Sequence, residues 1–262
     1  MNSTRIYAIV LKFWFDTKRD MFRLFDVFWW PAFDLFVWGL LSTYLNKTTG
    51  GSINFILLFL AGMIFWSFFD RASRDISRSM MEELWNRNLP NIFSTPLRLT
   101  EYVIGVLIIA TIKLIVGGIF LLVLSTLFYG FRVSSMGWLF VPAMAGLMLF
   151  GWSVSFVVQS LVLRFGHTIE VFIWAVAIFL QPFSCVFYPL SALPVWAQYV
   201  ARLLPSMYLF EAMRAMLAGR SVNTGDIVVS FALNAVYLTL SVVYFYRTFR
   251  HAKVNGLLTK PF

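Results

Sequence analysis

The chain has 262 residues, of which 60% are hydrophobic, 19% are aromatic and only 13% are charged, and its mean hydropathy is +0.79. A surface that faces water needs about 25–35% Asp, Glu, Lys and Arg, so this composition excludes a free soluble enzyme, a disordered chain and a fibrous protein. Most of the chain must be surrounded by lipid. The excess of 21 Lys and Arg over 12 Asp and Glu gives a net charge of +9, which we attribute to contact with anionic lipid headgroups and not with nucleic acid.

Residues 1–26 are predicted to form an amphipathic helix. Arg5, Lys12, Arg19 and Asp26 recur every seven residues, and the apolar side chains mostly occupy the opposite face. The stretch has neither the uninterrupted apolar core nor the cleavage site of a signal peptide. We therefore expect a helix that lies in the membrane interface with its aromatic face in the acyl boundary. The alternative is a cytosolic helix that packs on a partner.

Six stretches are long and apolar enough to cross a bilayer, whose hydrocarbon core of ~30 Å requires ~20 mostly apolar residues in a helix. The alternating segments of ~10 residues that build a transmembrane β-barrel do not occur in the sequence. We predict an all-α membrane protein with a six-helix transmembrane domain over residues 27–262. The expected spans are 27–45, 53–70, 103–128, 138–163, 169–188 and 227–246.

Lys and Arg fall unevenly on the two sides that these spans define. Cytoplasmic segments of membrane proteins carry an excess of Lys and Arg, which predicts that both termini of this chain are cytoplasmic. With that orientation the cytoplasmic side holds most of these residues, and the outer side holds few. The cytoplasmic set is Arg5, Lys12, Lys18, Arg19, Arg23, Arg71, Arg74, Arg78, Arg87, Arg98, Arg164, Arg247, Arg250, Lys253 and Lys260, and the outer set is Lys47, Arg132, Arg202, Arg214 and Arg220.

Residues 71–101 form the longest cytoplasmic stretch between two spans. The first part is a polar helical sequence that continues to Trp85, and the second part is turn-rich and contains Pro90 and Pro96. A short helix along the membrane face, with charged side chains and a Trp, is suited to contact a cytosolic partner. The alternative is a solvated loop.

Residues 189–225, on the outer side, are too apolar for a water-exposed loop but contain Pro189 and Pro194. Backbone at membrane depth must be helical or buried in protein, because lipid offers it no hydrogen-bond partner. We therefore expect a helical hairpin that dips back into the outer leaflet. Its two helices are predicted over about 194–204 and 206–218.

Ionisable residues within these apolar segments are candidates for function, because an unpaired charge at mid-bilayer costs ~2.5–3.5 kcal/mol or more. Asp34 lies in the first span and Lys113 in the third. In one interpretation they line a substrate path or couple a proton. In the other they form one interhelix ion pair, or Lys113 bonds carbonyl groups of a neighbouring helix. In the outer hairpin, Glu211 and Arg214 are three residues apart on one helix face and are predicted to pair.

Motifs for the common enzyme chemistries are absent. The dipeptide Gly-Lys does not occur, which excludes the Gly-x-x-x-x-Gly-Lys phosphate-binding loop, so we do not expect this chain to hydrolyse ATP or to bind a cofactor. His-Glu-x-x-His and Gly-x-Ser-x-Gly are also missing. The one cysteine, Cys185, excludes an intrachain disulfide and a cysteine metal cluster. We expect neither an enzyme nor a bound metal.

One enzyme family shares part of its pattern with this sequence. Glu82-Glu83-Leu-Trp-Asn-Arg87 and His251-Ala-Lys-Val-Asn255 resemble two motifs of the intramembrane prenyl-protein (CAAX-type) endopeptidases. The third motif of that family, a Phe four residues before a His, is absent at both histidines. The matching pieces also lie in charged cytoplasmic segments, whereas that chemistry requires them to converge inside the membrane. We regard this as the weakest alternative.

The N-terminal amphipathic helix, the six spans and three short motifs together resemble the membrane subunit of type-2 ATP-binding-cassette exporters, which include drug, Nod-factor, teichoic-acid and O-polysaccharide exporters. The first motif is Ser-Thr-Pro96-Leu before the third span. The other two are Tyr188-Pro-Leu-Ser-Ala-Leu-Pro194 and Glu211-Ala-Met-Arg214 before the last span. The resemblance covers nearly the whole chain.

The resemblance implies a permease subunit without its own ATPase site. A second copy or a homologous permease would enclose one path, and separate ATPase subunits carrying ATP and Mg would bind a coupling helix. In this chain the matching coupling residues are Glu82, Glu83, Trp85, Arg87, Pro90 and Pro96.

The same resemblance implies export of an amphipathic, lipid-linked or drug-like cargo across the plasma membrane, the inner membrane of a bacterium or archaeon. The outer hairpin would gate release through Pro189, Pro194, Glu211 and Arg214, and the path would include Asp34, Trp38, Trp66, Lys113, Phe172 and Phe179. The main alternative is a secondary transporter or channel without ATP coupling. Such a protein would be expected to show inverted repeats or several polar groups at the membrane midplane, and we find no motif shared between residues 27–128 and 138–246.

Overall fold

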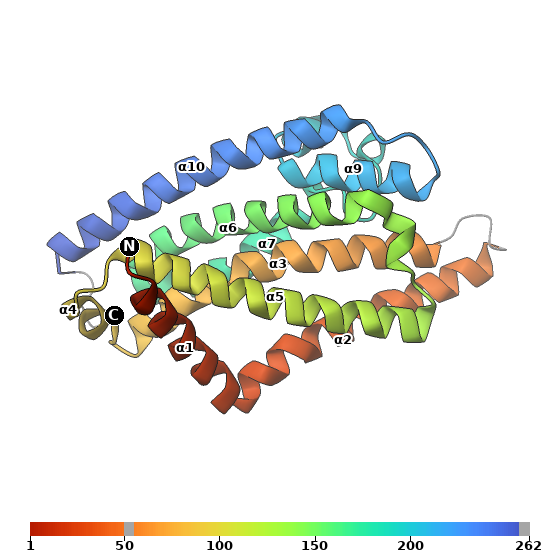
Figure 1. Ribbon diagram of the computed structural model, residues 1–262. Coiled ribbons are helices and arrows are strands. Elements are labelled where there is room, and N and C mark those ends of the chain that lie inside the picture. Colours follow the sequence, from red (N-terminus) through yellow and green to blue (C-terminus); the bar gives the residue numbers. More distant parts are fainter. Residues whose placement is uncertain (50–54, 257–262) are drawn as a thin grey trace.

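A computed structural model describes residues 1–49 and 55–256 and contains only helices and connections over those ranges (Figure 1). Five helical stretches in these ranges are long and apolar enough to cross a membrane, so the all-α membrane protein predicted from the sequence is confirmed in this coarser form. The start of the second predicted span at residue 53, and Lys260, lie outside the described residues. The five stretches are α2 (Met21–Thr48), α3 (Phe55–Trp85), α5 (Leu99–Tyr129), α10 (Thr224–Val254) and the run Val133–Phe165, which joins η1 (Val133–Leu139) to α6 (Phe140–Phe165).

The predicted fifth span is represented by a shorter helix, α7 (Glu170–Phe183), which follows the 3₁₀ turn η2 (Gly166–Ile169). Its 14 residues rise only about 21 Å, less than the ~30 Å of a hydrocarbon core. The helix ends where Cys185 takes a left-handed backbone conformation with φ +56°. The expected helical span over 169–188 is therefore not present at its full length.

The N-terminal segment contains a break that the sequence analysis missed. The amphipathic helix α1 (Ser3–Arg19) stops at Asp20, and α2 begins at Met21, six residues before the expected start of the first span. The cause is the carboxylate of Asp20, which accepts hydrogen bonds from the backbone N–H groups of Phe22 and Arg23 and caps a new helix. The two helices therefore meet at an angle (Figure 1).

α1 packs across the beginning of α5. Ile9 is buried against Gly105, where an added Cβ would lie 2.6 Å from the Ile9 side chain, and the ring of Phe13 meets Tyr102 edge-on. Trp14 and Phe15 on the other side of α1 are exposed. The predicted apolar face is therefore divided: Ile9 and Phe13 pack on α5, and Trp14 remains exposed.

The polar stretch after the second predicted span is not a separate helix along the membrane face. α3 continues without interruption to Trp85, because charges at 70, 71, 74, 75 and 78 fall on one face of the helix and leave its opposite face free to pack. The short helix of this segment comes later, as α4 (Leu89–Ser94) with Pro90 in its first turn.

The centre of the bundle is the contact between α3 and α6, which depends on small residues. A Cβ added at Gly151 would lie 2.7 Å from both the Phe69 carbonyl oxygen and the Ala72 side chain. The hydroxyl groups of Ser77 and Ser155 are 3.0 Å apart across the same interface. Small residues of this kind let membrane helices approach closely.

The outer segment forms two short helices, as predicted: α8 (Val195–Arg202) and α9 (Pro205–Leu217), after the 3₁₀ turn η3 (Leu190–Ala192). α9 lies beside α10 and α6 at one end of the bundle, and most of its residues up to Arg214 are buried (Figure 1). The other end holds α1, α4 and the last turns of α3, α6 and α10. We call it the basic end, because its Lys and Arg residues outnumber those of the α9 end.

Candidate functional site: a polar cavity between α2, α3 and α7

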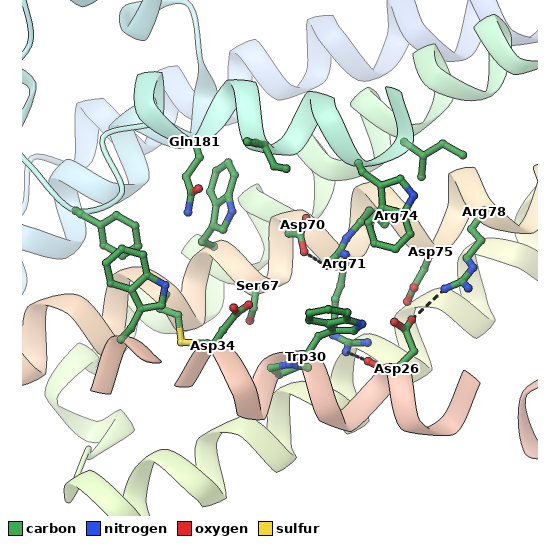
Figure 2. Close-up of a pocket in the computed structure, with 18 residues that line it drawn as sticks. Asp26, Trp30, Asp34, Ser67, Asp70, Arg71, Arg74, Asp75, Arg78 and Gln181 are labelled. Atoms are coloured by element: carbon green, nitrogen blue, oxygen red, sulfur yellow. Dashed lines mark hydrogen bonds and ion pairs between the residues drawn. The ribbon is translucent and has the colours of Figure 1, made fainter. Parts of the chain in front are cut away.

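A row of charged residues runs along one face of α3. Asp70, Arg71, Arg74, Asp75 and Arg78 are separated by steps of three and four residues, which places them on adjacent turns. The row begins about midway along the 31-residue helix and continues toward the basic end. It faces α2 on one side and α7 on the other (Figure 2).

These residues line a cavity of about 320 Å³ bounded by α2, α3 and α7, which we call the polar cavity. Its rim is exposed at Trp30 and Asp34 on α2 and at Ile178 on α7, so the cavity opens on the surface of the bundle between these two helices. The lining residues are Asp26, Trp30, Pro31, Asp34 and Trp38 from α2; Met63, Trp66, Ser67, Asp70, Arg71, Arg74, Asp75 and Arg78 from α3; Ile173, Trp174, Ile178 and Gln181 from α7; and Phe187.

All three arginines of the cavity are held by neighbouring groups. Arg71 is buried and donates through Nη2 to the backbone carbonyl oxygens of residues 26 and 27, at 3.0 and 2.6 Å. Arg74 forms an ion pair with Asp70, and its guanidinium lies 5.0 Å from the ring centre of Trp174. Arg78 bonds the Asp26 carboxylate at 3.1 Å.

Two carboxylates of the cavity have no comparable partner. Asp34 forms no hydrogen bond or ion pair with any described residue, and Oδ2 of Asp75 is buried without a hydrogen-bond partner among them. In Figure 2, Asp34 points from α2 toward the Ser67 side of α3. Nε of Arg74 is also buried without a hydrogen-bond partner among the described residues, but the four aspartates of the lining outnumber its three arginines, so the cavity carries excess negative charge.

Stacked aromatic rings close the end of the cavity that points away from the basic end. Trp38 of α2 stacks on Phe187 with ring centres 4.2 Å apart, and Phe59 of α3 stacks on Phe187 at 5.5 Å. The chain approaches α3 closely here, since a Cβ at Gly62 would lie 2.8 Å from the Val186 carbonyl oxygen. We call Trp38, Phe59 and Phe187 the ring stack.

The structure brings together half of the predicted path residues. Asp34, Trp38 and Trp66 line the polar cavity. Phe172 and Phe179 are exposed on α7 and do not line it; Ile173, Trp174, Ile178 and Gln181 of the same helix line it instead.

Lys113 lines a different and much smaller cavity, together with Arg23, Asp26 and Glu82. The interhelix ion pair between Asp34 and Lys113, considered above as an alternative, does not form among the described residues.

Two of the predicted coupling residues are engaged inside the protein. The Glu83 side chain is only 5% exposed and forms an ion pair with Lys12 of α1. Glu82 is bonded by Arg23 at 3.0 Å and by Arg78 at 3.2 Å. Desolvation by burial lowers the pKa of Lys12, although the carboxylate of Asp16 opposes the shift. These pairs tie α1 and the start of α2 to the end of α3.

The other predicted coupling residues lie at or near the surface of the basic end. Trp85 and Arg87 are exposed, Pro90 is partly exposed in the first turn of α4, and Pro96 is exposed after it. Arg87 has φ +52°, the left-handed conformation that glycine usually supplies at the end of a helix. α4 itself is held by Phe93, whose ring lies 4.8 Å from that of Phe249 on α10.

At the α9 end, the predicted pair between Glu211 and Arg214 is present at 2.9 Å. The pair also fixes the chain that follows α7. Arg214 donates to the Cys185 carbonyl oxygen at 2.6 Å, and Glu211 accepts the backbone N–H of Leu190 at the same distance. Pro189 and Pro194 immediately precede η3 and α8.

The sequence analysis missed the larger part of the cavity wall, notably Arg74, Asp75, Trp174 and Gln181. One signal was available for the α3 residues: steps of three and four between charges are typical of a helix face, whereas a solvated loop has no such period. No signal identified the inward face of α7, because both of its faces are apolar.

The fold and the cavity define a multi-pass membrane protein with a polar cavity in its helical bundle. Comparison with protein-family models matches residues 7–218 to the ABC-2 type transporter. The chain belongs to this family and is a membrane permease component of type-2 ATP-binding-cassette transporters, which confirms the resemblance noted in the sequence. The family implies a partner subunit with an ATP-binding cassette. Comparison with curated proteins gave no match.

The glutamates of Glu82–Arg87, the stretch that resembles an endopeptidase motif, are engaged elsewhere: Glu82 is bonded by Arg23 and Arg78, and Glu83 pairs with Lys12. Within residues 1–49 and 55–256, no group of three or more His, Cys, Asp and Glu side chains is arranged to hold a metal ion. His251, at the end of α10, bonds Asn255 one turn later.

Proposed function

We propose that this chain is the membrane subunit of an exporter that moves an amphipathic, lipid-linked or drug-like substrate through the polar cavity. The energy would come from ATP and Mg held by a separate ATPase subunit. The observation that carries the proposal is the cavity itself: a space of about 320 Å³ with charged and aromatic walls, set between membrane-spanning helices. Such a space is expensive to maintain in lipid unless it serves a ligand.

Six crossings account for the path of the chain. α6 and α10 run in the same direction in Figure 1, so the segment between them returns to the α9 end. In our proposal α7 makes this return, extended by η2 before it and by residues 184–188 after it. The basic end then faces the cytoplasm with both termini, in agreement with the distribution of Lys and Arg. The α8–α9 hairpin enters the outer leaflet of the bacterial or archaeal inner membrane.

A second copy of the chain, or a homologous permease, would cover the opening between α2 and α7. Asp34 sits about midway along α2 and is exposed at the rim. A carboxylate at this depth does not face lipid without a large cost, and polar groups inside membranes are normally turned toward protein or a water-filled path. Two copies that bring these openings together would enclose a single path.

The ATPase would act on the exposed surface formed by Trp85, Arg87 and α4. This surface is linked to the bundle at two places: α4 contacts α10 through Phe93, and the end of α3 is tied to α1 through Glu83 and Lys12. A displacement of α4 therefore reaches both α10 and the α1–α2 corner. Glu82 and Glu83 would not contact the ATPase directly. Their ion pairs would connect the end of α3 to α1 and α2, so that a displacement at the surface reaches those helices.

Release on the outer side would require the ring stack to open. The stack joins α2, α3 and the chain after α7, and that chain is fixed by Glu211 and Arg214 of α9. In our proposal Pro189 and Pro194 allow the hairpin to move as one piece with residues 184–190. Displacement of the hairpin would then withdraw Phe187 from the cavity.

The experiment is affinity capture of an ATP-binding-cassette ATPase by the full-length chain. The chain is expressed at native level in its source organism, and the captured proteins are identified by mass spectrometry. The variant Trp85→Ala removes an exposed indole at the basic end and is expected to reduce capture at least severalfold. The control Trp196→Ala removes a more exposed indole on α8, 65% against 37% for Trp85, and is expected to leave capture unchanged. Equal capture by both variants would contradict the coupling surface, and a chain that transports without any ATPase would contradict the function.

A further inference from the structure

The positions of the four tryptophans around Asp34 indicate what the polar cavity binds. Trp30 and Trp38 lie four residues before and after Asp34, so all three side chains share one face of α2. Trp66 of α3 and Trp174 of α7 complete the walls. Asp34 is therefore a carboxylate set between indole rings, exposed to the cavity and without a partner among the described residues.

This arrangement is selective in sign. The faces of indole rings attract cations, and a carboxylate in a partly desolvated site does so more strongly. An anionic headgroup would have to compete for guanidinium groups that are already partly engaged: Nη2 of Arg71 bonds two backbone carbonyls, and Arg74 and Arg78 pair with Asp70 and Asp26. The lining also holds four aspartates against three arginines, which favours a cation over an anion. The unsatisfied Oδ2 of Asp75 adds to the same demand for positive charge.

We propose that the polar cavity binds an organic cation with an apolar, ring-bearing body, and that Asp34 is the counter-ion of its charged group. The charged end lies beside Asp34, between Trp30 and Trp38, and the apolar body extends toward Met63, Trp66 and the ring stack. A volume of about 320 Å³ is within the range of sites for small drug-like molecules. This inference rests on the proposed function for the place of the cavity in the transport path. It narrows the proposed cargo, which was amphipathic, lipid-linked or drug-like, to an amphipathic organic cation.

The experiment measures binding of two probes of nearly equal shape and opposite charge, tetraphenylphosphonium and tetraphenylborate. Full-length protein is held in nanodiscs of uncharged phosphatidylcholine, and equilibrium dialysis of each labelled probe is corrected with empty nanodiscs. Wild type is expected to bind the cation saturably and the anion only at the level of empty discs. Triphenylphosphine oxide, which has aryl rings and no net charge, is expected to compete weakly.

Four variants separate the role of the charge from general effects on the fold. Asp34→Asn is expected to weaken cation binding about tenfold or more, which corresponds to 1.4 kcal/mol. Asp34→Glu is expected to retain most of the affinity, and Trp30→Leu to weaken it severalfold. Glu170→Gln is the matched control, because Glu170 begins α7 outside the cavity and has no ion-pair partner among the described residues.

The inference is overturned if Asp34→Asn binds the cation as well as wild type does, if the anion or the neutral probe binds more tightly than the cation, or if Glu170→Gln reduces binding as much as Asp34→Asn does. Trp30→Leu keeps the test decisive if Asp34→Asn does not fold. Failure here together with successful ATPase capture would reject only the cationic substrate. Failure of ATPase capture with charge-selective binding would reject the proposed coupling and leave the cavity assignment standing.

Discussion

Two faces of the same helix, α3, are built in opposite ways. The face toward α6 is filled with small side chains and has its polar groups paired: Gly151 fits under the Phe69 carbonyl, and Nε2 of Gln159 donates to the Ile76 carbonyl at 2.6 Å. The face toward α2 and α7 is hollow, carries five charged residues and leaves Asp75 with an unpaired oxygen.

This difference shows how a membrane bundle separates stability from function. Close packing and complete hydrogen bonding are what a lipid-embedded structure needs, because lipid cannot satisfy polar groups. A hollow with incomplete charge pairing destabilises the fold and persists where a ligand or a partner completes it. The packed face therefore identifies the scaffold, and the hollow face identifies the site.

The packed face is most directly broken at Gly151. The variant Gly151→Ala would place a Cβ 2.7 Å from a backbone oxygen that cannot rotate away, so α3 and α6 must separate. We expect a loss of about 3 kcal/mol, measured by unfolding in mixed micelles with increasing SDS. The control Gly117→Ala on α5 meets its nearest atom at 3.4 Å and is expected to be nearly neutral. Equal losses in both variants would refute the special role of the α3–α6 contact.

The charged side chains at the basic end are expected to stabilise the fold and not to take part in ligand binding. The variant Glu83→Gln leaves Lys12 without its buried partner and weakens the bond from Asn88 to the same side chain. We expect a loss of about 2 kcal/mol in the same unfolding assay and faster proteolysis of α1, with probe binding in the polar cavity unchanged. Full stability in this variant would show that the tie between α1 and α3 is unimportant.

Removing a charge from the hollow face is expected to stabilise the fold, whereas the two changes above destabilise it. Asp34→Asn removes an uncompensated charge from a spanning helix, and we expect it to raise the free energy of unfolding by about 1.5 kcal/mol while it weakens cation binding. The same SDS titration measures the change. A loss of stability would indicate that Asp34 has a structural partner. It would contradict the conclusion that the hollow face of α3 serves binding at the expense of stability.

The smallest effect is expected at Arg87, where a residue other than glycine occupies the left-handed position after α3. The backbone N–H of Asn88 bonds the Glu83 carbonyl and that of Arg87 bonds the Leu84 carbonyl, the pattern of a glycine-ended helix. Arg87→Gly is expected to stabilise the fold by about 0.5–1 kcal/mol and to reduce ATPase capture. Stabilisation without reduced capture would assign Arg87 no part in coupling.

Much of the fold could be predicted from the sequence, because hydropathy fixes where long apolar helices lie. Five spans, the two hairpin helices and the pair of Glu211 with Arg214 follow from local patterns. Local patterns failed where tertiary contacts decide the boundary. The polar residues after Asp70 predict a separate helix along the membrane face, yet they continue α3 because α6 packs against its other face.

The candidate site was only partly predictable for the same reason. A charge in a span, such as Asp34, stands out in the sequence, whereas its neighbours depend on how helices rotate. α7 has aromatic residues around its circumference, so the choice of Phe172 over Trp174 could not be decided before the packing of α3 was known. The ring stack was missed because Phe187 lies after the helix, in a turn that only the approach to Gly62 positions.

The central claim is that the polar cavity faces a second copy of the chain. It is tested most directly by pulsed electron paramagnetic resonance on the assembled transporter, with one spin label per chain and Cys185 replaced by serine. Ile178 at the cavity rim and Val123 on α5 are both well exposed, and each is labelled in turn after substitution by cysteine. The account predicts a shorter distance between the two labels at position 178 than between those at 123; a shorter distance at 123 would contradict it.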